Sequence, residues 1–475
     1  MNNRYAFVLT IAGAGMFLST LDSGVINVAL PFLQQDFHTT VNTISWTISG
    51  YFLVVSATLM LFGKLGDRFG RVRIFSAGLL LFALGSLLCG LAFSANQLIA
   101  WRALQALGAA AMQGTAAGII TTLIESHHKN RALGMLGLII GIGPVIGPTF
   151  AGTVITFSSW RWIFFVNIPI CLLALLGARR LHDTGEYQHA SLDGVGMVLF
   201  ALTIFSLVLT LTLGGHPDGY GLLISGLALV ALLSFLFFLY QERRTSSPML
   251  DVRLFKIASF NVSLIDTLTF GFATAIIFML PPLELHLFAH LSAWQIGLIS
   301  LSTPLGVVIL SRFSGIAIDR WGEQRLVLAG LLVMLVALLL LALRQPSWGV
   351  VSLLPFLFLY GVGGGIFIPP NMSNFMKAAG APHQGTMGAM NRMLHNLGLA
   401  IGVATAALVL GLHASETQSQ MTSGFRQTWL LAVGMLTVAV VASIVDLRRG
   451  RTLENGVHDK QSLGSTSTSG ARRVS

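Results

Sequence analysis

Charged residues are scarce in this chain. They make up 10% of the 475 residues, whereas hydrophobic residues make up 54%, and the mean hydropathy is +0.78. A soluble protein of this length needs far more charge to cover its surface. The composition therefore excludes a soluble protein and predicts a polytopic membrane protein.

Other absences narrow the function. The two cysteines, Cys89 and Cys171, lie in apolar runs, which favours core packing over a disulfide or a metal site. No G-x-x-x-x-G-K-[ST] sequence is present to cradle a nucleotide, so transport would have to use an ion gradient or the substrate's own gradient. The spans contain no nucleophile–base set or metal-ligand cluster, so we expect no enzyme, metal or cofactor. A sensor or scaffold is disfavoured because no signalling domain is apparent.

The formal net charge is +10, but its distribution argues against nucleic-acid binding. The charges fall in short loops and in the tail, with no basic patch among exposed aromatics. The first apolar run is long and no small-residue cleavage site follows it, so we expect it to remain as a helix.

Apolar runs long enough to cross about 30 Å of hydrocarbon recur along the chain. They predict an all-α membrane protein of about fourteen spans, approximately at 6–30, 43–63, 74–94, 97–121, 132–155, 161–179, 193–213, 220–240, 259–283, 293–314, 325–343, 349–370, 385–411 and 427–447. Most of the 28 Lys and Arg residues fall in the termini and in alternate loops, and the opposite loops hold Arg161, Arg344 and Arg426. The positive-inside rule then places both termini in the cytoplasm.

One charged turn occurs twice. Residues 63–70 read GKLGDRFG and residues 315–322 read GIAIDRWG, each where one apolar segment ends and another begins. The repeat predicts two related halves that rock against each other, as in a secondary transporter. Asp67 and Arg71 could form a latch that breaks as the halves move, although positive-inside charge alone explains the basic residues. The predicted cytoplasmic gate comprises Gly63, Asp67, Arg68, Gly70, Arg71, Asp319 and Arg320.

Asp22 and Arg102 are ionisable residues inside predicted spans, where charge is costly and tends to be functional. Gln105 follows Arg102 by three residues and shares its helix face. Asp22 is the obvious partner for Arg102, and competition between a proton and Arg102 for this carboxylate would provide a switch. The alternatives are a polar anchor near Asn27 for Asp22 and a structural pin between helices for Arg102.

The fifth span contains GLIIGIGPVIGPTFAG. Gly143 and Gly147 share one face, which lets another helix approach closely, and Pro144 and Pro148 each remove a backbone hydrogen bond. We expect a shaped hinge at the interface of the halves, with generic helix packing as the alternative.

Other buried polar residues give weaker signals. Asp266 is a second candidate proton or cation site, with a capped structural Asp as the alternative. Glu284 either attracts cations or is solvated, and His395 is either a hydrogen-bonded spacer or a group for pH coupling. The predicted substrate cavity comprises Asn27, Gln105, Glu284, Asn391 and His395.

The chain resembles the major facilitator superfamily, and in particular its fourteen-helix drug:proton antiporter branch. The loop GKLGDRFGRVR resembles the superfamily's cytoplasmic signature. Four further segments resemble motifs of that branch's first, fourth, fifth and sixth helices, namely LDSGVINVALP, RALQALGAAA, GIGPVIGPTFAG and WRWIFFVNIP. In the chain, Ala106, Ser23, His395 and Glu284 depart from residues that are commoner in the family.

The resemblance implies two six-helix bundles, at 1–182 and 257–447, around a central cavity. Two inserted helices lie in the linker 183–256, and 448–475 is expected to be a disordered cytoplasmic tail. The implied function is proton-coupled export of amphipathic, cationic drugs across the cell membrane by a monomer, with Asp22 and Arg102 as the family's embedded acid and arginine. The alternative is a dedicated exporter of a metabolite, peptide, siderophore or lipid.

Overall fold

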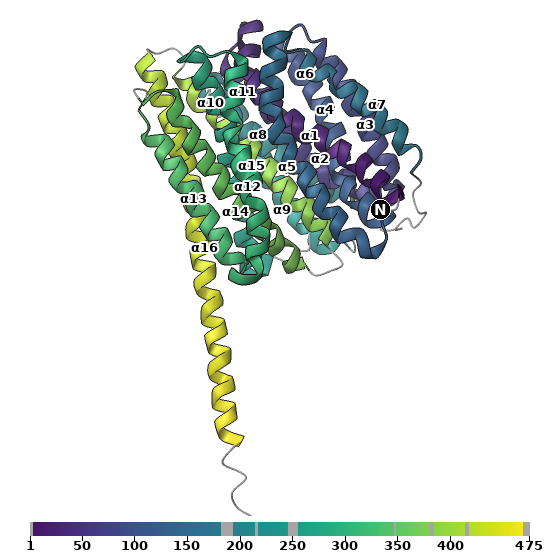
Figure 1. The fold of residues 1–475 in the computed structure, drawn as a ribbon, viewed down its shortest axis with the longest axis vertical. Helices are drawn as coiled ribbons and strands as arrows, with labels where there is room; N and C mark the ends of the chain where they lie inside the picture. Colours follow the sequence, from purple (N-terminus) through teal and green to yellow (C-terminus); the bar gives the residue numbers. More distant parts are fainter. Residues whose placement is uncertain are drawn as a thin grey trace, which may run out of the picture.

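The computed structural model describes residues 3–181, 193–213, 217–245, 255–345, 348–379, 384–413 and 418–468. Across these residues the secondary structure is helical, without a β-strand. Most helices run side by side in one bundle (Figure 1). This is the arrangement expected of a polytopic membrane protein, because a helix satisfies its own backbone hydrogen bonds without water.

The helices of the first half and of the linker follow the predicted spans. Their bounds are α1 Asn3–Asp36, α2 Val41–Phe69, α3 Arg71–Gly90, α4 Ala95–Leu123, α5 Ser126–Phe157, α6 Trp162–Phe165, α7 Asn167–Ala178, α8 Gly194–Leu213 and α9 Pro217–Arg244. Those of the second half are α10 Ala258–Leu287, α11 Ala293–Ser300, α12 Ser302–Trp321, α13 Glu323–Leu343, the short 3-10 helix η3 Val350–Ser352, α14 Leu353–Ala379, α15 Gln384–Leu412 and α16 Gln418–Thr468.

Every predicted apolar run overlaps at least one helix. Within the described residues, eleven helical segments are long and apolar enough to cross a membrane, and three shorter apolar segments occupy the remaining predicted spans. The shorter ones are Ile146–Phe157, Trp162–Ala178 and Gly194–Thr210. The prediction of an all-α polytopic membrane protein is therefore confirmed.

The two halves repeat one packing scheme. In the first half α1 packs along α5, and both α2 and α3 pack along α4; in the second half α10 packs along α15, and both α12 and α13 pack along α14. The repeated turn also has a shared conformation. Gly70 joins α2 to α3 with φ 105°, and Gly322 joins α12 to α13 with φ 75°. Positive φ strains residues with a Cβ, which explains why Gly ends both copies.

The linker helices α8 and α9 pack against each other, and α8 also contacts α2 and α15. Thr203 Oγ1 donates to Ser234 Oγ across the pair at 2.9 Å, and the amide of Gly196 donates to Asp193 Oδ1 at 2.9 Å at the start of α8. Because α2 and α15 belong to different halves, α8 lies beside a contact between them.

Helix α16 continues to Thr468 and leaves the bundle as a long projection (Figure 1), where the sequence predicted disorder from residue 448. Its backbone hydrogen bonds can form without a packing partner, although an isolated polar helix is marginal in water. The beginning of α1 and the projecting part of α16 lie at the same end of the bundle (Figure 1), hereafter the terminal end. The division into domains stays a prediction.

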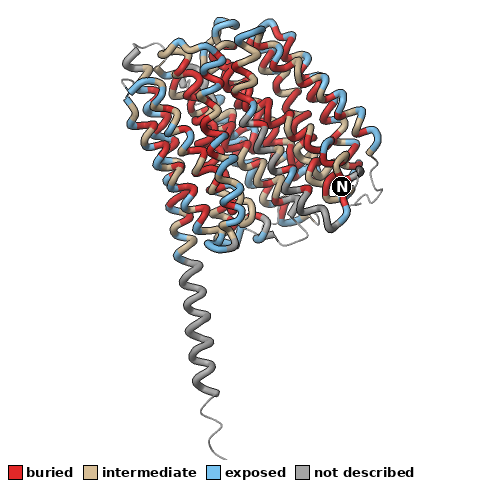
Figure 2. The backbone as a smooth tube through the Cα atoms, viewed as in Figure 1, coloured by how far each residue is buried: buried red, intermediate tan, exposed pale blue. Residues whose placement is uncertain are grey.

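Buried residues concentrate in the centre of the bundle, and exposed ones on its outside (Figure 2). Many exposed side chains are large and apolar, as on α9, where Leu222, Leu229 and Phe237 are exposed. Such a surface is suited to contact with lipid.

Candidate functional site

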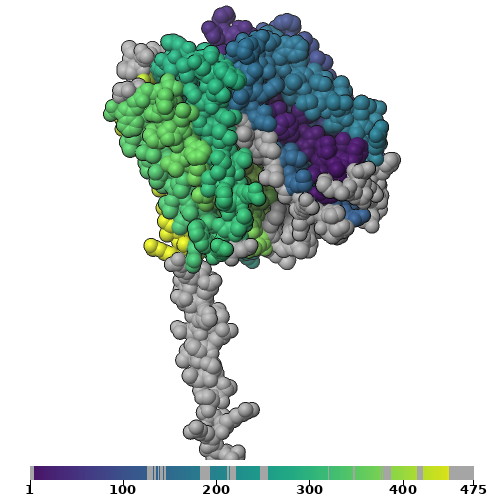
Figure 3. Space-filling view, viewed as in Figure 1, coloured from purple at the N-terminus to yellow at the C-terminus, as the bar shows by residue number. Residues whose placement is uncertain are grey.

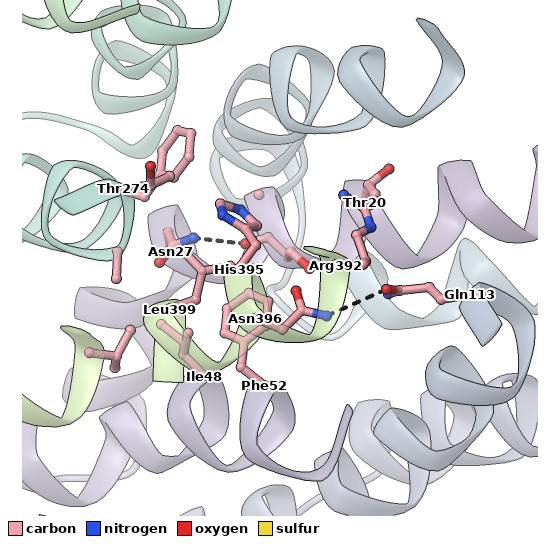
Figure 4. Close-up of a pocket in the computed structure, with 15 residues that line it drawn as sticks. Thr20, Asn27, Ile48, Phe52, Gln113, Thr274, Arg392, His395, Asn396 and Leu399 are labelled. Carbon is pink, nitrogen blue, oxygen red and sulfur yellow. Dashed lines mark hydrogen bonds between the residues drawn. The ribbon is translucent and has the colours of Figure 1, made fainter. Parts of the chain in front are cut away.

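A pocket lies between the two halves (Figure 4). Helices α1, α2 and α4 of the first half and α10 and α15 of the second half contribute its lining residues: Thr20, Ser23, Gly24, Asn27, Ile48, Phe52, Gln113, Thr274, Ala275, Phe278, Arg392, His395, Asn396, Leu399 and Val403. The volume open to a water-sized molecule is about 80 Å³. Pockets that bury a drug-sized ligand measure about 300–1,000 Å³, so such a ligand requires the halves to move apart.

One face of α15 forms a wall of this pocket. Arg392, His395, Asn396 and Leu399 recur at helical spacing and line the same pocket as Thr20 and Asn27 of α1 (Figure 4). The Nδ2 of Asn396 donates to Oε1 of Gln113 on α4 at 3.5 Å. This hydrogen bond joins the two halves across the pocket.

Two ionisable side chains of this wall have donor or acceptor atoms that are buried and unpaired. Among the described residues, Nε and Nη2 of Arg392 and Nδ1 of His395 have no hydrogen-bond partner. The His395 ring stacks on Phe270 of α10, with ring centroids 5.3 Å apart. Unpaired polar groups at this depth are costly, so they are poised to receive a ligand or water.

Asp22 and Arg102 form a buried ion pair between α1 and α4, through Oδ2 and Nη1. Arg102 Nη1 also donates to Gln105 Oε1 at 2.7 Å, and Gln105 Nε2 donates to Asp22 Oδ1 at 3.1 Å. The pairing expected from the sequence is therefore present. Asp22 is 5% exposed and Arg102 is 1% exposed, so any change in the charge of Asp22 acts on a desolvated guanidinium.

Three further contacts fix the Arg102 network. Arg102 Nε donates to the carbonyl of Thr47 at 3.0 Å, and the guanidinium lies 4.1 Å from the centre of the Tyr51 ring. Gln105 Nε2 also donates to Ser86 Oγ at 2.8 Å. The network thus connects α1, α2, α3 and α4.

The network adjoins the pocket without lining it. Asp22 is followed by Ser23, which lines the pocket, and Tyr51 lies within electrostatic reach of both Arg102 and Arg392. Gln105, which the sequence assigned to the cavity, belongs to the ion-pair network instead. The reason is geometric, because its side chain shares the Arg102 face of α4.

Asp266 occupies a different place. It is 1% exposed on α10, and Ser443 Oγ of α16 donates to its Oδ2 at 2.9 Å. Its Oδ1 has no hydrogen-bond partner within the described part of the chain. Asp266 faces α16 and is not among the residues that line the pocket.

The other predicted cavity residues divide. Asn27 and His395 line the pocket, whereas Glu284 and Asn391 do not. Glu284 pairs with Arg344, whose Nε also donates to Ser352 Oγ at 2.8 Å. Asn391 Nδ2 donates to Thr267 Oγ1 on α10 at 3.2 Å.

The first repeated turn carries an ion pair. Arg71 Nε donates to Asp67 Oδ1 at 2.8 Å, and Arg71 Nη2 lies 2.7 Å from the same oxygen. Arg71 Nη1 donates to the carbonyl of Gly118 on α4 at 2.9 Å. These contacts tie α2, α3 and α4 within one half, so the Asp67–Arg71 pair is not a bond between the halves in this conformation.

The remaining predicted gate residues lie in or beside the turns. Gly63 packs closely on α4, where a methyl group would lie 3.4 Å from the Gly114 carbonyl oxygen. Arg68 and Arg320 are exposed, and the Asp319 side chain lies outside the described residues. In the second copy, Glu323 follows Gly322 and pairs with Lys377 of α14.

The glycines of α5 pack within the first half. A methyl group at Gly143 would lie 2.8 Å from the Leu21 amide nitrogen of α1, and one at Gly147 would lie 3.0 Å from Cα of Gly24. α5 is helical from Ser126 to Phe157, and the Pro144 side chain lies outside the described residues. Gly143 and Gly147 therefore serve close packing on α1 rather than contact between the halves.

The contact between halves uses the next part of α5. A methyl group at Gly297 of α11 would lie 2.5 Å from the carbonyl oxygen of Pro148, and the Trp294 amide donates to Thr156 Oγ1 at 3.1 Å. The halves also meet at this end of the bundle, opposite the terminal end, in the space-filling view (Figure 3). Of the predicted hinge residues whose side chains the structure describes, Pro148 is thus the one that touches the other half.

Arg392 and the Gln113–Asn396 pair were not assigned to the cavity from the sequence. Arg392 lies within a predicted span, which is the signal that singled out Arg102. Its position three residues before His395 would have placed both on one helix face. The partner helix could not be read from the sequence, because Gln113 and Asn396 are 283 residues apart.

The chain belongs to the Major Facilitator Superfamily, whose family profile matches residues 12–403, with a second match at 262–463. It is 29% identical over 450 residues to the riboflavin transporter RibZ of Clostridioides difficile (strain 630), covering 93% of this chain and 97% of that protein. It is also 29% identical over 391 residues to multidrug resistance protein 3 of Bacillus subtilis (strain 168), covering 82% and 76%.

A solved structure shares the fold. It is a bacterial homologue of the human lysosomal transporter Spinster, in an inward-facing and occupied conformation, with a TM-score of 0.65 and 14% identity. The alignment covers 94% of this chain and 98% of that one. Family and fold together identify a multi-pass membrane transporter rather than an enzyme.

Proposed function

We propose that the protein is a proton-coupled antiporter of the fourteen-helix drug:proton branch that exports amphipathic small molecules by alternating access. The observation that carries the proposal is the buried Asp22–Arg102–Gln105 network directly beside the pocket between the halves. A proton on Asp22 would cancel its attraction for Arg102, and a buried cation without its partner is strongly disfavoured. Protonation therefore supplies a free-energy difference between two arrangements of the halves.

The packing supports alternating access. The halves touch tightly through Pro148 and Gly297 away from the terminal end, and the pocket between them is smaller than pockets that bury a drug-sized ligand. Substrate binding and release would each require separation at one end. The repeated turns ending at Gly70 and Gly322 are the proposed gate at the terminal end, and Pro148 belongs to the proposed hinge region.

The energetics suffice for export. One charge that crosses 100 mV releases about 2.3 kcal/mol, and about 1.4 kcal/mol corresponds to a tenfold concentration ratio. One proton per cycle would thus sustain roughly a forty-fold gradient of a neutral substrate. Asp266, buried with one unpaired carboxylate oxygen, is the second proposed proton site.

We place the protein in the cytoplasmic membrane as a monomer with both termini in the cytoplasm, on the basis of the loop charges. A reporter that fluoresces only in the cytoplasm, fused to residue 475, should be bright. A dark fusion at full expression would contradict this orientation.

The direct test of coupling uses everted membrane vesicles with an acidic lumen and a fluorescent lumenal pH reporter. Lipophilic cations such as ethidium, neutral dyes and lipophilic acids are added in turn. We expect at least one class to raise lumenal pH with the wild type, because its entry is exchanged for an exiting proton. Asp22→Asn should abolish this response.

Asp36→Asn is the matched control, since Asp36 lies on the same helix α1 but is half exposed and contacts Trp160 and Arg161. It should respond as the wild type does. Undiminished proton exchange by Asp22→Asn would exclude the proposed role of this carboxylate.

A dedicated metabolite exporter is the second candidate, because the chain is as similar to a riboflavin transporter as to a multidrug resistance protein. A saturable response to one native metabolite, with none to the dye panel, would favour it.

A further inference from the structure

We propose that the pocket between the halves binds an amphipathic carboxylate and that Arg392 is the residue that pairs with the carboxylate group. The inference rests on the proposed export function and names the substrate class of its pocket. It differs from the sequence-based expectation of cationic substrates.

The guanidinium group of Arg392 is incompletely paired. It lines the pocket, and its Nε and Nη2 are buried without a hydrogen-bond partner among the described residues. Among the described residues, the other buried or half-buried arginines already have anionic partners: Arg71 with Asp67, Arg102 with Asp22, Arg161 with Asp36, and Arg344 with Glu284. A guanidinium remains charged in proteins, so Arg392 needs an anion from another source.

The unpaired nitrogens of Arg392 lie on one edge of its guanidinium group. Nε and Nη2 form one edge of the guanidinium fork, and this edge can bind a carboxylate with two parallel N–H donors. The structure contains an example of this edge in use, because Arg71 directs Nε and Nη2 at Asp67 at 2.8 and 2.7 Å. The same edge is vacant on Arg392.

The charge of the pocket lining also favours an anionic ligand. Among the pocket-lining residues that the structure describes, Arg392 is the one with a permanent charge, and none has a carboxylate. His395 adds an unpaired ring nitrogen. A cationic ligand would meet a like charge with no anion to offset it, whereas a carboxylate would receive donors from Arg392, and from His395 Nδ1 in the tautomer that carries its proton there.

The pocket lining also contains several apolar side chains. Ile48, Phe52, Phe278, Leu399 and Val403 provide apolar surface in the same pocket. An apolar body beside an acidic group fits this combination, because apolar contact supplies affinity and the few polar groups fix orientation.

Tyr51 lies near both the proposed carboxylate site and the Asp22–Arg102 pair. Its ring covers Arg102, and it lies within electrostatic reach of Arg392. Neutralising Arg392 with a carboxylate and protonating Asp22 would act on neighbouring groups in one region of the bundle. Both ligands could thus bias the same motion of the halves.

The test measures equilibrium binding to the purified full-length protein in lipid nanodiscs. The probes share a naphthalene body and differ in charge: 1-naphthaleneacetic acid, its methyl ester and 2-(1-naphthyl)ethylamine. We expect the acid to bind the wild type at least about tenfold more tightly than the ester or the amine, since charge-assisted bidentate pairs are the stronger hydrogen bonds.

Variants assign the preference to the guanidinium. Arg392→Gln should equalise binding of the acid and the ester, and Arg392→Lys should retain part of the preference, because it keeps the charge but loses the two-donor edge. Arg312→Gln is the matched control, as Arg312 is exposed on α12 and does not line the pocket. It should keep the wild-type preference.

Either of two results would overturn the inference: tighter binding of the amine than of the acid by the wild type, or a full acid preference in Arg392→Gln. The vesicle assay tests the antiport proposal independently of the carboxylate site. Loss of all proton exchange with retained acid binding would refute the antiport proposal and leave the carboxylate site standing.

Discussion

Removing Arg102 alone should destabilise the protein more than removing both partners of the Asp22–Arg102 pair. Arg102→Gln leaves Asp22 buried at 5% exposure, with Gln105 Nε2 still donating to it at 3.1 Å. Breaking a buried pair from one side costs about 3–5 kcal/mol. Most of that cost should appear as a lower free energy of unfolding.

Asp22→Asn should cost less. Arg102 keeps the Thr47 carbonyl at 3.0 Å, Gln105 Oε1 at 2.7 Å and the Tyr51 face at 4.1 Å. Each hydrogen bond to a charged group contributes about 1.5–3 kcal/mol, so these contacts compensate part of the lost carboxylate. The double variant Asp22→Asn/Arg102→Gln has no buried charge at this position, and it should be more stable than Arg102→Gln alone.

The assay is a double-mutant cycle on the purified protein, with the free energy of unfolding measured by titration with a denaturing detergent. The interaction energy should be favourable and exceed about 1 kcal/mol, which is above the scatter of additive sites. If the double variant is no more stable than Arg102→Gln, the ion pair does not dominate this network, and the electrostatic switch proposed from it loses its basis.

Three further predictions concern movement, the turn and charge. Gly297→Val should lower the transport rate in the vesicle assay at least about tenfold, because the added side chain clashes with the Pro148 carbonyl oxygen, which lies 2.5 Å from a Cβ at this position. Gly434→Val is the control, since a Cβ there meets no atom within 4 Å. Equal transport rates of the two variants would contradict the close contact. Asp67→Asn should lower the unfolding free energy by less than about 1 kcal/mol, because the Asp67–Arg71 pair is about one-third exposed; a larger loss in the detergent titration would show a role beyond a surface pair. A lumen-positive potential in everted vesicles should speed uptake of the naphthalene acid. The reason is that exchange of an entering monoanion for one exiting proton moves two charges in the same electrical direction. Uptake that does not respond to the potential would contradict that charge balance.

Much of the fold could be predicted from the sequence. A membrane span is a local property of about twenty consecutive residues, so the apolar runs located the helices without knowledge of their neighbours. The turn repeated at Gly70 and Gly322 predicted two related halves, and both copies have positive φ in the structure. The Asp22–Arg102 pair was also predictable, because a buried charge requires a partner and few are available.

The assignment of side chains to the pocket was less predictable. The Gln105 side chain donates to Asp22 and does not line the pocket, and Glu284 forms an ion pair with Arg344. Gly143 and Gly147 packed on α1, while Pro148 met α11 of the other half.

By itself, the sequence determined the helical spans, the repeated turns and the need for partners at buried charges, because hydrophobic length and local charge act over a few turns of one helix. Only the tertiary structure decided that Arg392 faces the pocket with a free guanidinium edge. The packing of α15 against α2 and α10 determines which of its faces is enclosed, and those helices are separated from it by up to several hundred residues. No local pattern carries that information.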